Sequence, residues 1–459
     1  MKLISLKSVV ITAAVLFGWP WLAAAASDSA PSAVSLGFGD ASGPAVVQLA
    51  APIDLETAKA DNIFGAVELA KLKLEQERQK RLDIWGGQPP SYAEFPARAE
   101  IILAIWRQDV GVVNLYLADK QGRNLWIKSP GAPPVSVSSH ARLYSRYYIA
   151  PSHQATVVGV LYPYMEERNG RFHTKEVVYV PPTGDMRTPE MLTAGSDYLS
   201  YLVRDAFAEL KKRQVKSRAF PGQLLADVMD PYLIKSVVVI EHSDHRTLLG
   251  EDDPESVLGR FYVDLAVNRD NAFAYAESSA GALGLAQFIP STYALFVRNR
   301  PDLGLLPDFQ AGMADHQNAI MAEAAYFDDT LALLPEDIRG NYLTNPALAA
   351  DFLAAAYNGG VSRVRKAYAN FGDTWDQAHN SSYSLRQETV WYVAKLRKVY
   401  AMLTSGVYAT PTAPSNTLPD GASLASQTHV VTTTEPVQLS RIDPISTICF
   451  GDGSCVSID

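Results

Sequence analysis

The chain has 459 residues, a formal net charge of -9 at pH 7 and 47% hydrophobic residues. This length and apolar content allow two or three domains with a sizeable core. Because the balance is mildly acidic and Lys and Arg form no dense block, the composition argues against nucleic acid as a main partner.

The N-terminus has the order of a secretory signal. Two lysines precede an apolar run from Val9 to Leu22, and Ala23–Ala26 follow it. This order predicts a signal peptide over residues 1–26, and therefore a periplasmic or secreted protein. An uncleaved membrane anchor is the alternative, because the apolar run approaches spanning length.

A linker and a helix are predicted next. Residues 27–53 are rich in Ala, Ser, Pro and Gly, which is typical of a linker. Apolar residues then recur at helical spacing and predict an amphipathic helix over residues 54–86, with a solvated charged end.

Residues 92–185 have the pattern of strands. Five segments are rich in β-branched and aromatic residues, and the sequences DKQG and ERNG between them are typical of hairpin turns. They predict a small antiparallel β domain without a catalytic constellation. The sequence leaves open whether this accessory domain binds an envelope protein or the wall, or braces its neighbour.

Residues 189–405 are mostly helical in pattern, and residues 406–459 form a Thr-, Pro- and Ser-rich tail. The tail holds the two cysteines of the chain, Cys449 and Cys455, separated by FGDGS. In an exported protein this spacing predicts a small disulfide ring. A metal clip would need further ligands nearby.

Glu241 stands at the end of a predicted buried helix. Leu233, Val237 and Ile240 share the apolar face of that helix. Burial raises the pKa of a carboxyl group, so such a Glu can hold a proton near neutral pH and give it to a leaving glycosidic oxygen. On the helix alone, an exposed or cation-paired Glu is the simpler interpretation.

Two further segments favour the catalytic interpretation. In SSAGALGLAQFIPST, at 278–292, the glycines permit a close approach by a sugar, and Gln287 offers a donor and an acceptor to an acetamido group. AAYNGG, at 355–360, carries Tyr357 and Asn358. A lone acid faced by polar side chains from two other segments is typical of a glycan-cleaving site.

These segments resemble motifs of the soluble lytic transglycosylases in the lysozyme superfamily. SSAGALGLAQFIPST is similar to S-x-x-G-A-x-G-L-M-Q-x-x-P, and it also resembles the corresponding segment of the membrane-bound B-type relatives. DPYLIKSVVVIEHS, AAYNGG and QETVWYVAKL resemble three other motifs in the family's order. The resemblance covers residues 221–404.

The resemblance implies an α+β, multi-domain protein in which a mainly α-helical, lysozyme-like catalytic domain follows the β domain. It implies peptidoglycan glycan strands as the substrate, with no cofactor and no metal. The expected reaction cleaves the MurNAc–GlcNAc β-1,4 bond and forms 1,6-anhydroMurNAc, with Glu241 as acid and then base. Substrate-binding roles are implied for Ser278, Gln287, Tyr357, Asn358 and Glu388.

The sequence also departs from the family. His242 separates Glu241 from Ser243, Ala286 replaces a Met, and an insert over residues 244–277 is expected to form a lobe or lid beside the cleft. A hydrolytic muramidase is one alternative, and it would need a second carboxylate to position water. The candidates are Asp244, Glu251, Asp252 and Asp253. A non-catalytic cell-wall-binding envelope protein is the other alternative.

Overall fold

The computed structural model describes most of the chain between residues 55 and 406. The described residues are 55, 57–94, 96–139, 142–168, 170–250, 254–377, 379, 381–406, 446–449 and 455–458. The predicted signal peptide and the predicted linker over residues 27–53 lie outside them. Within the described part of the chain, no helix is long and apolar enough to cross a membrane.

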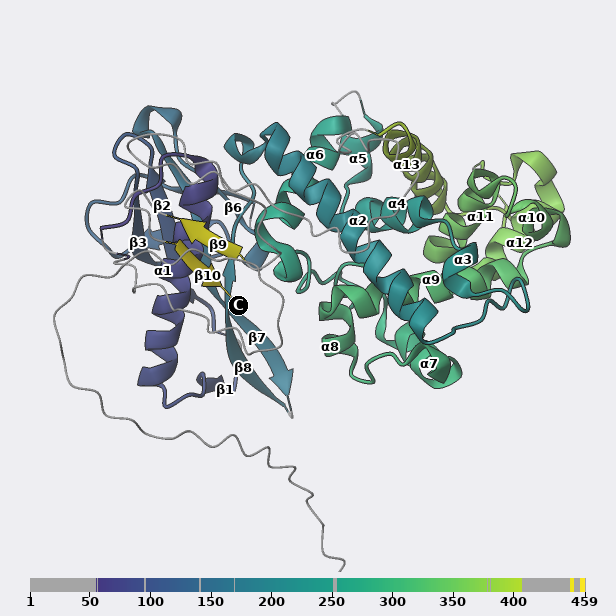
Figure 1. Ribbon diagram of the computed structural model, residues 1–459, viewed down its shortest axis with the longest axis horizontal. Helices are drawn as coiled ribbons and strands as arrows, with labels where there is room; N and C mark the ends of the chain where they lie inside the picture. Colours follow the sequence, from purple (N-terminus) through teal and green to yellow (C-terminus); the bar gives the residue numbers. More distant parts are fainter. Residues whose placement is uncertain are drawn as a thin grey trace, which may run out of the picture. The chain divides into compact units, whose positions relative to one another are not determined.

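A six-stranded antiparallel sheet forms the first folded part, in the order β1-β8-β7-β2-β3-β4 (Figure 1). Its turns at Gly122 and Gly170 have positive φ and fall at the predicted turn sequences. A separate hairpin pairs β5 with β6. The strands are β1 (Ser91–Tyr92), β2 (Ala99–Arg107), β3 (Val112–Gln121), β4 (Asn124–Ile127), β5 (Ser136–Ser139), β6 (Arg146–Tyr148), β7 (Ala155–Arg168) and β8 (Arg171–Tyr179).

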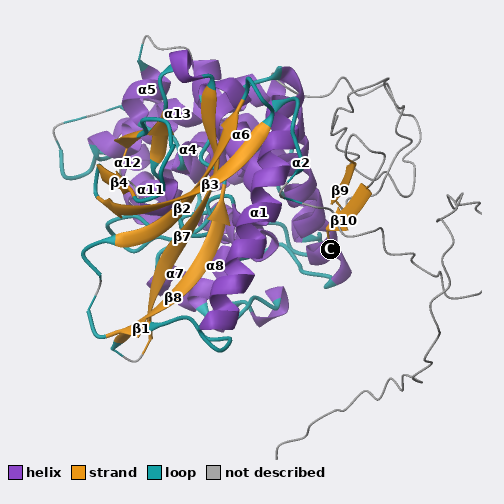
Figure 2. Cartoon of the chain, turned by 90° about the vertical axis from the view of Figure 1, so that its left-hand side faces the viewer, coloured by secondary structure: helices purple, strands orange, loops and turns teal. Residues whose placement is uncertain are grey.

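Helix α1 (Ile63–Ile84) packs on this sheet (Figure 2). It begins later than predicted because Asn62 caps it, accepting a hydrogen bond from the Gly65 N–H at 2.9 Å. Most of its charged end is exposed, as predicted, but Arg81 turns to the sheet and pairs with the buried Glu176 of β8 at 2.8 Å. The helix is thus fixed to the sheet by an ion pair as well as by apolar contacts.

The second folded part is helical and is built around α4 (Pro231–Glu241). Asp230 caps its start and Pro231 occupies the first turn, while Val237, Val239 and Ile240 have no solvent exposure. Helices α2, α9, α11 and α13 pack against α4. The helices are α2 (Pro189–Lys212), α3 (Leu225–Val228), α5 (His245–Leu249), α6 (Pro254–Asn268), α7 (Pro290–Asn299), α8 (Phe309–Ala314), α9 (His316–Leu333), α10 (Glu336–Asn341), α11 (Pro346–Gly359), α12 (Val361–Phe371) and α13 (Gln387–Thr404).

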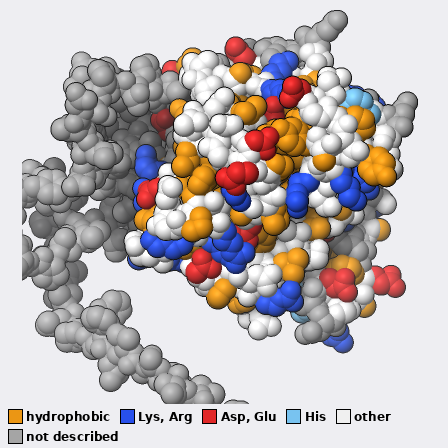
Figure 3. Space-filling model, turned by 90° about the vertical axis from the view of Figure 1, so that its right-hand side faces the viewer, with side chains coloured by type: hydrophobic (Ala, Val, Ile, Leu, Met, Phe, Trp, Pro, Cys, Tyr) orange, Lys and Arg blue, Asp and Glu red, His pale blue; other side chains and the backbone are white. Residues whose placement is uncertain are grey.

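This arrangement confirms the coarse prediction of an α+β protein with an antiparallel sheet domain and a helical C-terminal region. One face of the molecule carries basic, acidic and hydrophobic side chains interspersed (Figure 3). In that view, the described side chains form no large block of a single charge.

The insert forms α5 and α6, which are packed helices. Helix α6 runs against α2 so closely that a Cβ on Gly195 would lie 1.9 Å from the Tyr262 carbonyl oxygen. Its Asp264 accepts a hydrogen bond from the Tyr179 hydroxyl at 2.6 Å, and its Asn268 bonds both backbone polar groups of Val180. The insert is therefore a lobe that connects the sheet to the helical region.

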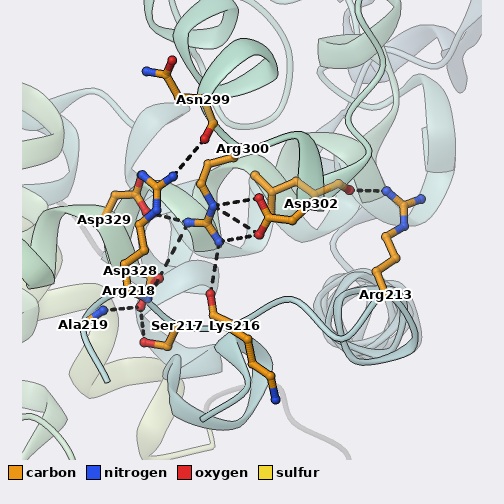
Figure 4. A network of polar contacts seen from close by, with 11 residues as sticks. Arg213, Lys216, Ser217, Arg218, Ala219, Asn299, Arg300, Asp302, Asp328 and Asp329 are labelled. Atoms are coloured by element: carbon orange, nitrogen blue, oxygen red, sulfur yellow. Dashed lines mark hydrogen bonds and ion pairs between the residues drawn. The ribbon is translucent and has the colours of Figure 1, made fainter. Parts of the chain in front are cut away.

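A buried ion network holds the helical part together away from Glu241 (Figure 4). Arg300 is 2% exposed and pairs with Asp302 and Asp329. Asp328, which has no exposure, accepts hydrogen bonds from the Ser217 hydroxyl and from the backbone N–H groups of residues 218 and 219. The network attaches the 215–220 segment to α9.

The C-terminal cysteines lie on two short paired strands. Strands β9 (Ser446–Cys449) and β10 (Cys455–Ile458) are antiparallel, and their register sets Cys449 opposite Cys455. The disulfide ring stays a prediction, and the rest of the tail beyond residue 406 lies outside the described residues.

Candidate active site

Glu241 is the last residue of α4 and is partly buried. The Tyr392 hydroxyl, from α13, donates a hydrogen bond to its Oε1 at 2.5 Å. Burial raises the pKa of Glu241 to about 7, while the Tyr392 hydrogen bond and the Lys395 charge act in the opposite sense. A carboxyl with this pKa exchanges a proton readily near neutral pH, as a general acid must.

Lys395 holds the end of α4 in place. Its ammonium donates to the carbonyl oxygens of Ile240 and Ser243, at 2.7 and 2.9 Å, and so satisfies acceptors that the helix end leaves unpaired. Burial lowers the pKa of Lys395, and the Glu241 charge opposes that shift. One turn of α13 therefore supplies both a hydroxyl that binds Glu241 and a cation that acts on its pKa.

His242, the departure from the family motif, links Glu241 to the Gly-rich turn, which is the glycine-containing part of the 278–292 segment. Its Nε2 lies 2.9 Å from the Leu285 carbonyl oxygen, and its ring stacks on Phe273 with centroids 4.1 Å apart. Burial lowers the pKa of His242 to about 4, so the ring is neutral at pH 7. We conclude that His242 is a packing residue that positions the turn.

The Gly-rich turn is held by its own hydrogen bonds. The Ser278 hydroxyl oxygen accepts from the Ala282 N–H at 3.0 Å. Gly284, at φ 75°, leaves no room for a Cβ, which would lie 2.1 Å from the Met313 carbonyl oxygen. Gln287, at φ 52°, donates to the carbonyl oxygens of Ala276 and Gly284. These contacts hold the turn in one shape. In it, Gln287 adopts a left-handed backbone conformation that favours glycine and is strained for other residues.

Tyr357 and Asn358 end α11 next to this turn. The Tyr357 hydroxyl donates to the Ala286 carbonyl oxygen at 2.5 Å, and its ring packs against Phe288 and Tyr326. Asn358 is exposed, and its Oδ1 accepts a hydrogen bond from the Thr389 hydroxyl at 2.7 Å. Tyr357 therefore joins α11 to the turn, while Asn358 remains accessible.

Glu388 lies apart from these residues. It occupies the first turn of α13, its side chain is 61% exposed, and it pairs with Arg386 at 3.6 Å. It stands one helical turn before Tyr392. The structure thus places the α13 motif's Tyr392 and Lys395 at Glu241 and its Glu388 on the surface.

A second carboxyl near Glu241 was missed by the sequence reasoning. Glu323 of α9 has no exposure, and neither of its oxygens has a hydrogen-bond partner within the described structure. Burial, followed by the charge of Glu241, raises its pKa well above the usual value. The signal in the sequence was a single acid within the apolar run AIMAEAAYF. The raised pKa favours the protonated form of Glu323, which is a poor base for activating water.

The acids considered for a hydrolytic mechanism are otherwise engaged or undescribed. Asp244 caps α5 by accepting from the N–H groups of residues 246 and 247, at 2.9 and 3.2 Å. Glu251, Asp252 and Asp253 lie outside the described residues. No group of three or more His, Cys, Asp or Glu side chains that could hold a metal ion occurs in the described part of the chain.

Comparison with known families identifies a domain that includes part of this site. Residues 271–380 match the family model described as the transglycosylase SLT domain, which confirms the resemblance to lytic transglycosylases with an SLT domain. The matched range contains Ser278, Gln287, Tyr357 and Asn358; it begins after Glu241 and ends before Glu388. Comparison with curated proteins and with solved structures gave no match.

Proposed function

We propose that this protein is a peptidoglycan lytic transglycosylase that cleaves the MurNAc–GlcNAc β-1,4 bond and forms 1,6-anhydroMurNAc. The SLT domain supports glycan cleavage in general. The observation that carries the specific proposal is the Glu241 carboxyl, with a pKa of about 7 and a hydrogen bond from Tyr392.

In the proposed reaction Glu241 gives one proton to the leaving group and then takes up another from the substrate. Protonated Glu241 gives its proton to the glycosidic oxygen as the bond from that oxygen to C1 of MurNAc breaks, and the substrate's acetamido group assists the departure. The Glu241 carboxylate then takes the proton of the MurNAc 6-hydroxyl while O6 bonds to C1. Because one carboxyl performs both steps, no second acid is required.

Tyr392 and Lys395 stabilise the carboxylate between the two steps. Tyr392 donates a hydrogen bond to it, and the ammonium of Lys395 contributes a positive charge. Both oppose the effect of burial on the Glu241 pKa, so the carboxyl is neither permanently protonated nor permanently ionised.

Substrate binding is proposed for residues around this acid. The exposed amide of Asn358 is suited to the acetamido group, and Tyr357 fixes the adjoining turn. Ser278 and Gln287 belong to that turn, where their hydrogen bonds to the backbone hold its shape. The role of Glu388 stays a prediction, since it lies on the surface one turn from Tyr392.

The cellular setting is proposed from the sequence alone. A signal peptide over residues 1–26 would export the chain to the periplasm, where peptidoglycan lies, or beyond it. A lysozyme-like catalytic domain over residues 189–405 would act there, and the β domain would offer a surface to an envelope protein.

Cleavage of purified peptidoglycan by residues 27–459 and by the Glu241→Gln variant tests the proposal. We expect the variant to lose at least a hundredfold in rate, the usual contribution of a general acid. Glu336→Gln, the same change at an exposed glutamate of α10 outside the site, is the matched control and should keep the wild-type rate. Unchanged cleavage by Glu241→Gln would exclude the mechanism and favour a non-catalytic wall-binding role.

A further inference from the structure

The Gly-rich turn is held from two sides, and only one of them belongs to the helical region. On that side, the His242 ring meets the Leu285 carbonyl oxygen, and the Tyr357 hydroxyl donates to the Ala286 carbonyl oxygen. Both contacts reach the far end of the turn. Its base, at residues 275–278, is contacted by the β domain instead.

Tyr275 stands directly before the residue on which the turn closes. The Ala276 carbonyl oxygen accepts hydrogen bonds from the Gly284 N–H and from the Gln287 side chain, both at 2.9 Å. An isolated bridge then joins the two limbs of the turn. The place of Ala276 therefore sets where the limbs meet, and Tyr275 fixes Ala276 through the planar peptide bond between them.

The β domain contacts Tyr275 from three of its segments. Tyr144, in the short turn between β5 and β6, accepts a hydrogen bond on its hydroxyl oxygen from the Tyr275 N–H at 2.9 Å. The Tyr164 ring, on β7, lies with its centroid 4.7 Å from that of Tyr275. The Lys175 ammonium, on β8, lies 5.0 Å from the Tyr275 centroid. These contacts hold both the backbone and the ring of Tyr275.

Tyr275 also belongs to the core of the β domain. Its ring packs against the apolar cluster formed by the sheet and the β5–β6 hairpin. Every other member of this cluster in the described part of the chain lies within residues 99–179. Because Tyr275 has its side chain in one core and its backbone at the base of the turn, the turn cannot shift without disturbing close-packed contacts in the β domain.

Tyr144 is itself fixed by its neighbours. Its ring meets the Tyr179 ring edge to face, with centroids 5.1 Å apart, and the Tyr179 hydroxyl donates to Asp264 of α6 at 2.6 Å. The acceptor for the Tyr275 N–H is thus a side chain that packing holds in place. Functional groups need support of this kind to stay within about 0.5 Å of their working positions.

We propose that the β domain positions the Gly-rich turn for catalysis, with Tyr144 as the positioning residue. The effect on cleavage rests on the proposed function, whereas the holding of the turn does not. The proposal assigns the accessory domain the bracing role that the sequence leaves open. Because Ser278 and Gln287 lie in the turn, loosening it should weaken substrate binding and leave Glu241 unchanged as an acid.

Two matched substitutions in the β5–β6 hairpin separate positioning from folding. Tyr144→Phe removes the hydroxyl that accepts from Tyr275, whereas Tyr147→Phe removes a buried hydroxyl without a partner in the described structure. Hydrogen exchange of the full mature chain, read by mass spectrometry over residues 275–288, reports opening of the turn. We expect Tyr144→Phe to speed this exchange about fivefold, as the loss of one hydrogen bond would. Tyr147→Phe should keep the wild-type rate.

Kinetics on soluble, uncross-linked peptidoglycan strands give the second readout. Tyr144→Phe should raise KM about fivefold, with kcat unchanged and the alkaline limb of the pH–rate profile unmoved, because Glu241 keeps its surroundings. A protein that is merely destabilised would instead lose kcat through a smaller folded fraction. Tyr164→Leu removes a ring contact to Tyr275, and should change exchange and KM in the same direction if Tyr144→Phe folds poorly.

Wild-type exchange over residues 275–288 in both Tyr144→Phe and Tyr164→Leu would overturn the proposal. Faster exchange spread evenly over the whole chain would also overturn it, because that reports lower global stability. So would faster exchange in the turn with an unchanged KM. If the turn opens faster in Tyr144→Phe but the wild type does not cleave, the proposed function falls while the positioning of the turn stands.

Discussion

Helix α9 carries two fully buried acids in opposite situations, and their replacement should change stability in opposite directions. Glu323 has no hydrogen-bond partner in the described structure, whereas Asp328 accepts three hydrogen bonds and lies 3.8 Å from the Arg300 guanidinium. We expect Glu323→Met to stabilise the protein and Asp328→Leu to destabilise it. The two changes are matched controls because both replace a buried acid with an apolar side chain on one helix.

The expected magnitudes follow from these contacts. A buried polar group without a partner costs about 1–3 kcal/mol, so Glu323→Met should add about 2 kcal/mol to the free energy of unfolding. Removing Asp328 would leave the Ser217 hydroxyl and the N–H groups of residues 218 and 219 without their acceptor, which together should cost about 3–5 kcal/mol, while Arg300 keeps Asp302 and Asp329. Asp328→Leu should lose roughly that amount.

The gain from Glu323→Met should also depend on pH. The folded-state pKa of Glu323 is raised, so the folded protein holds this proton more tightly than the unfolded chain. The stability of the wild type is therefore reduced progressively as pH rises above about 4.5, by at most about 1.4 kcal/mol per unit. The variant lacks this loss, so its advantage should widen with pH.

Urea unfolding at pH 5 and pH 8, with cleavage assayed at pH 7, checks this prediction. Glu323→Met should be the more stable protein at both pH values, with the larger gain at pH 8, and should still cleave. A destabilised Glu323→Met would show that the carboxyl is satisfied in the folded protein. A stable variant without activity would contradict the single-carboxylate mechanism.

Three further changes have expected outcomes. The first is Glu241→Gln. Because the wild-type pKa is raised to about 7, the wild type loses stability as pH rises from 4 to 7, and the stability of the variant relative to it should increase by about 3 kcal/mol over that range. A pH-independent difference in urea unfolding would refute that pKa. Tyr392→Phe removes a hydrogen bond that favours the Glu241 carboxylate, so it should lower the cleavage rate about tenfold and raise the Glu241 pKa. The alkaline limb of the pH–rate profile should then move to higher pH, and an unmoved limb would contradict this. Gly284→Ala should destabilise the protein by several kcal/mol, since its Cβ would meet the Met313 carbonyl oxygen. Gly281→Ala, where the added Cβ has open space, should cost about 1 kcal/mol through its positive φ alone. Equal melting temperatures of the two variants would count against this packing.

The sequence predicted features that depend on local pattern. The apolar period of Leu233, Val237 and Ile240 predicted a buried helix that ends at Glu241, and α4 does so. The turns at Gly122 and Gly170 followed from their residue types.

Contacts between distant segments could not be predicted in this way. Nothing local to Arg81 indicates the buried Glu176 on β8, so their ion pair could not be predicted, although most of the charged end of α1 is exposed as expected. The position of Glu323 close to Glu241 depends on how α9 packs against α4, which no period within either helix reveals.

The central claim is that Glu241 acts as acid and then base to close a 1,6-anhydro ring. Mass spectrometry of the products from purified peptidoglycan, digested by residues 27–459 and by Glu241→Gln, tests it most directly. We predict anhydro-muropeptides from the wild type and none from the variant. Reducing-end products that also disappear in the variant would contradict the claim, because water would then be the attacking group.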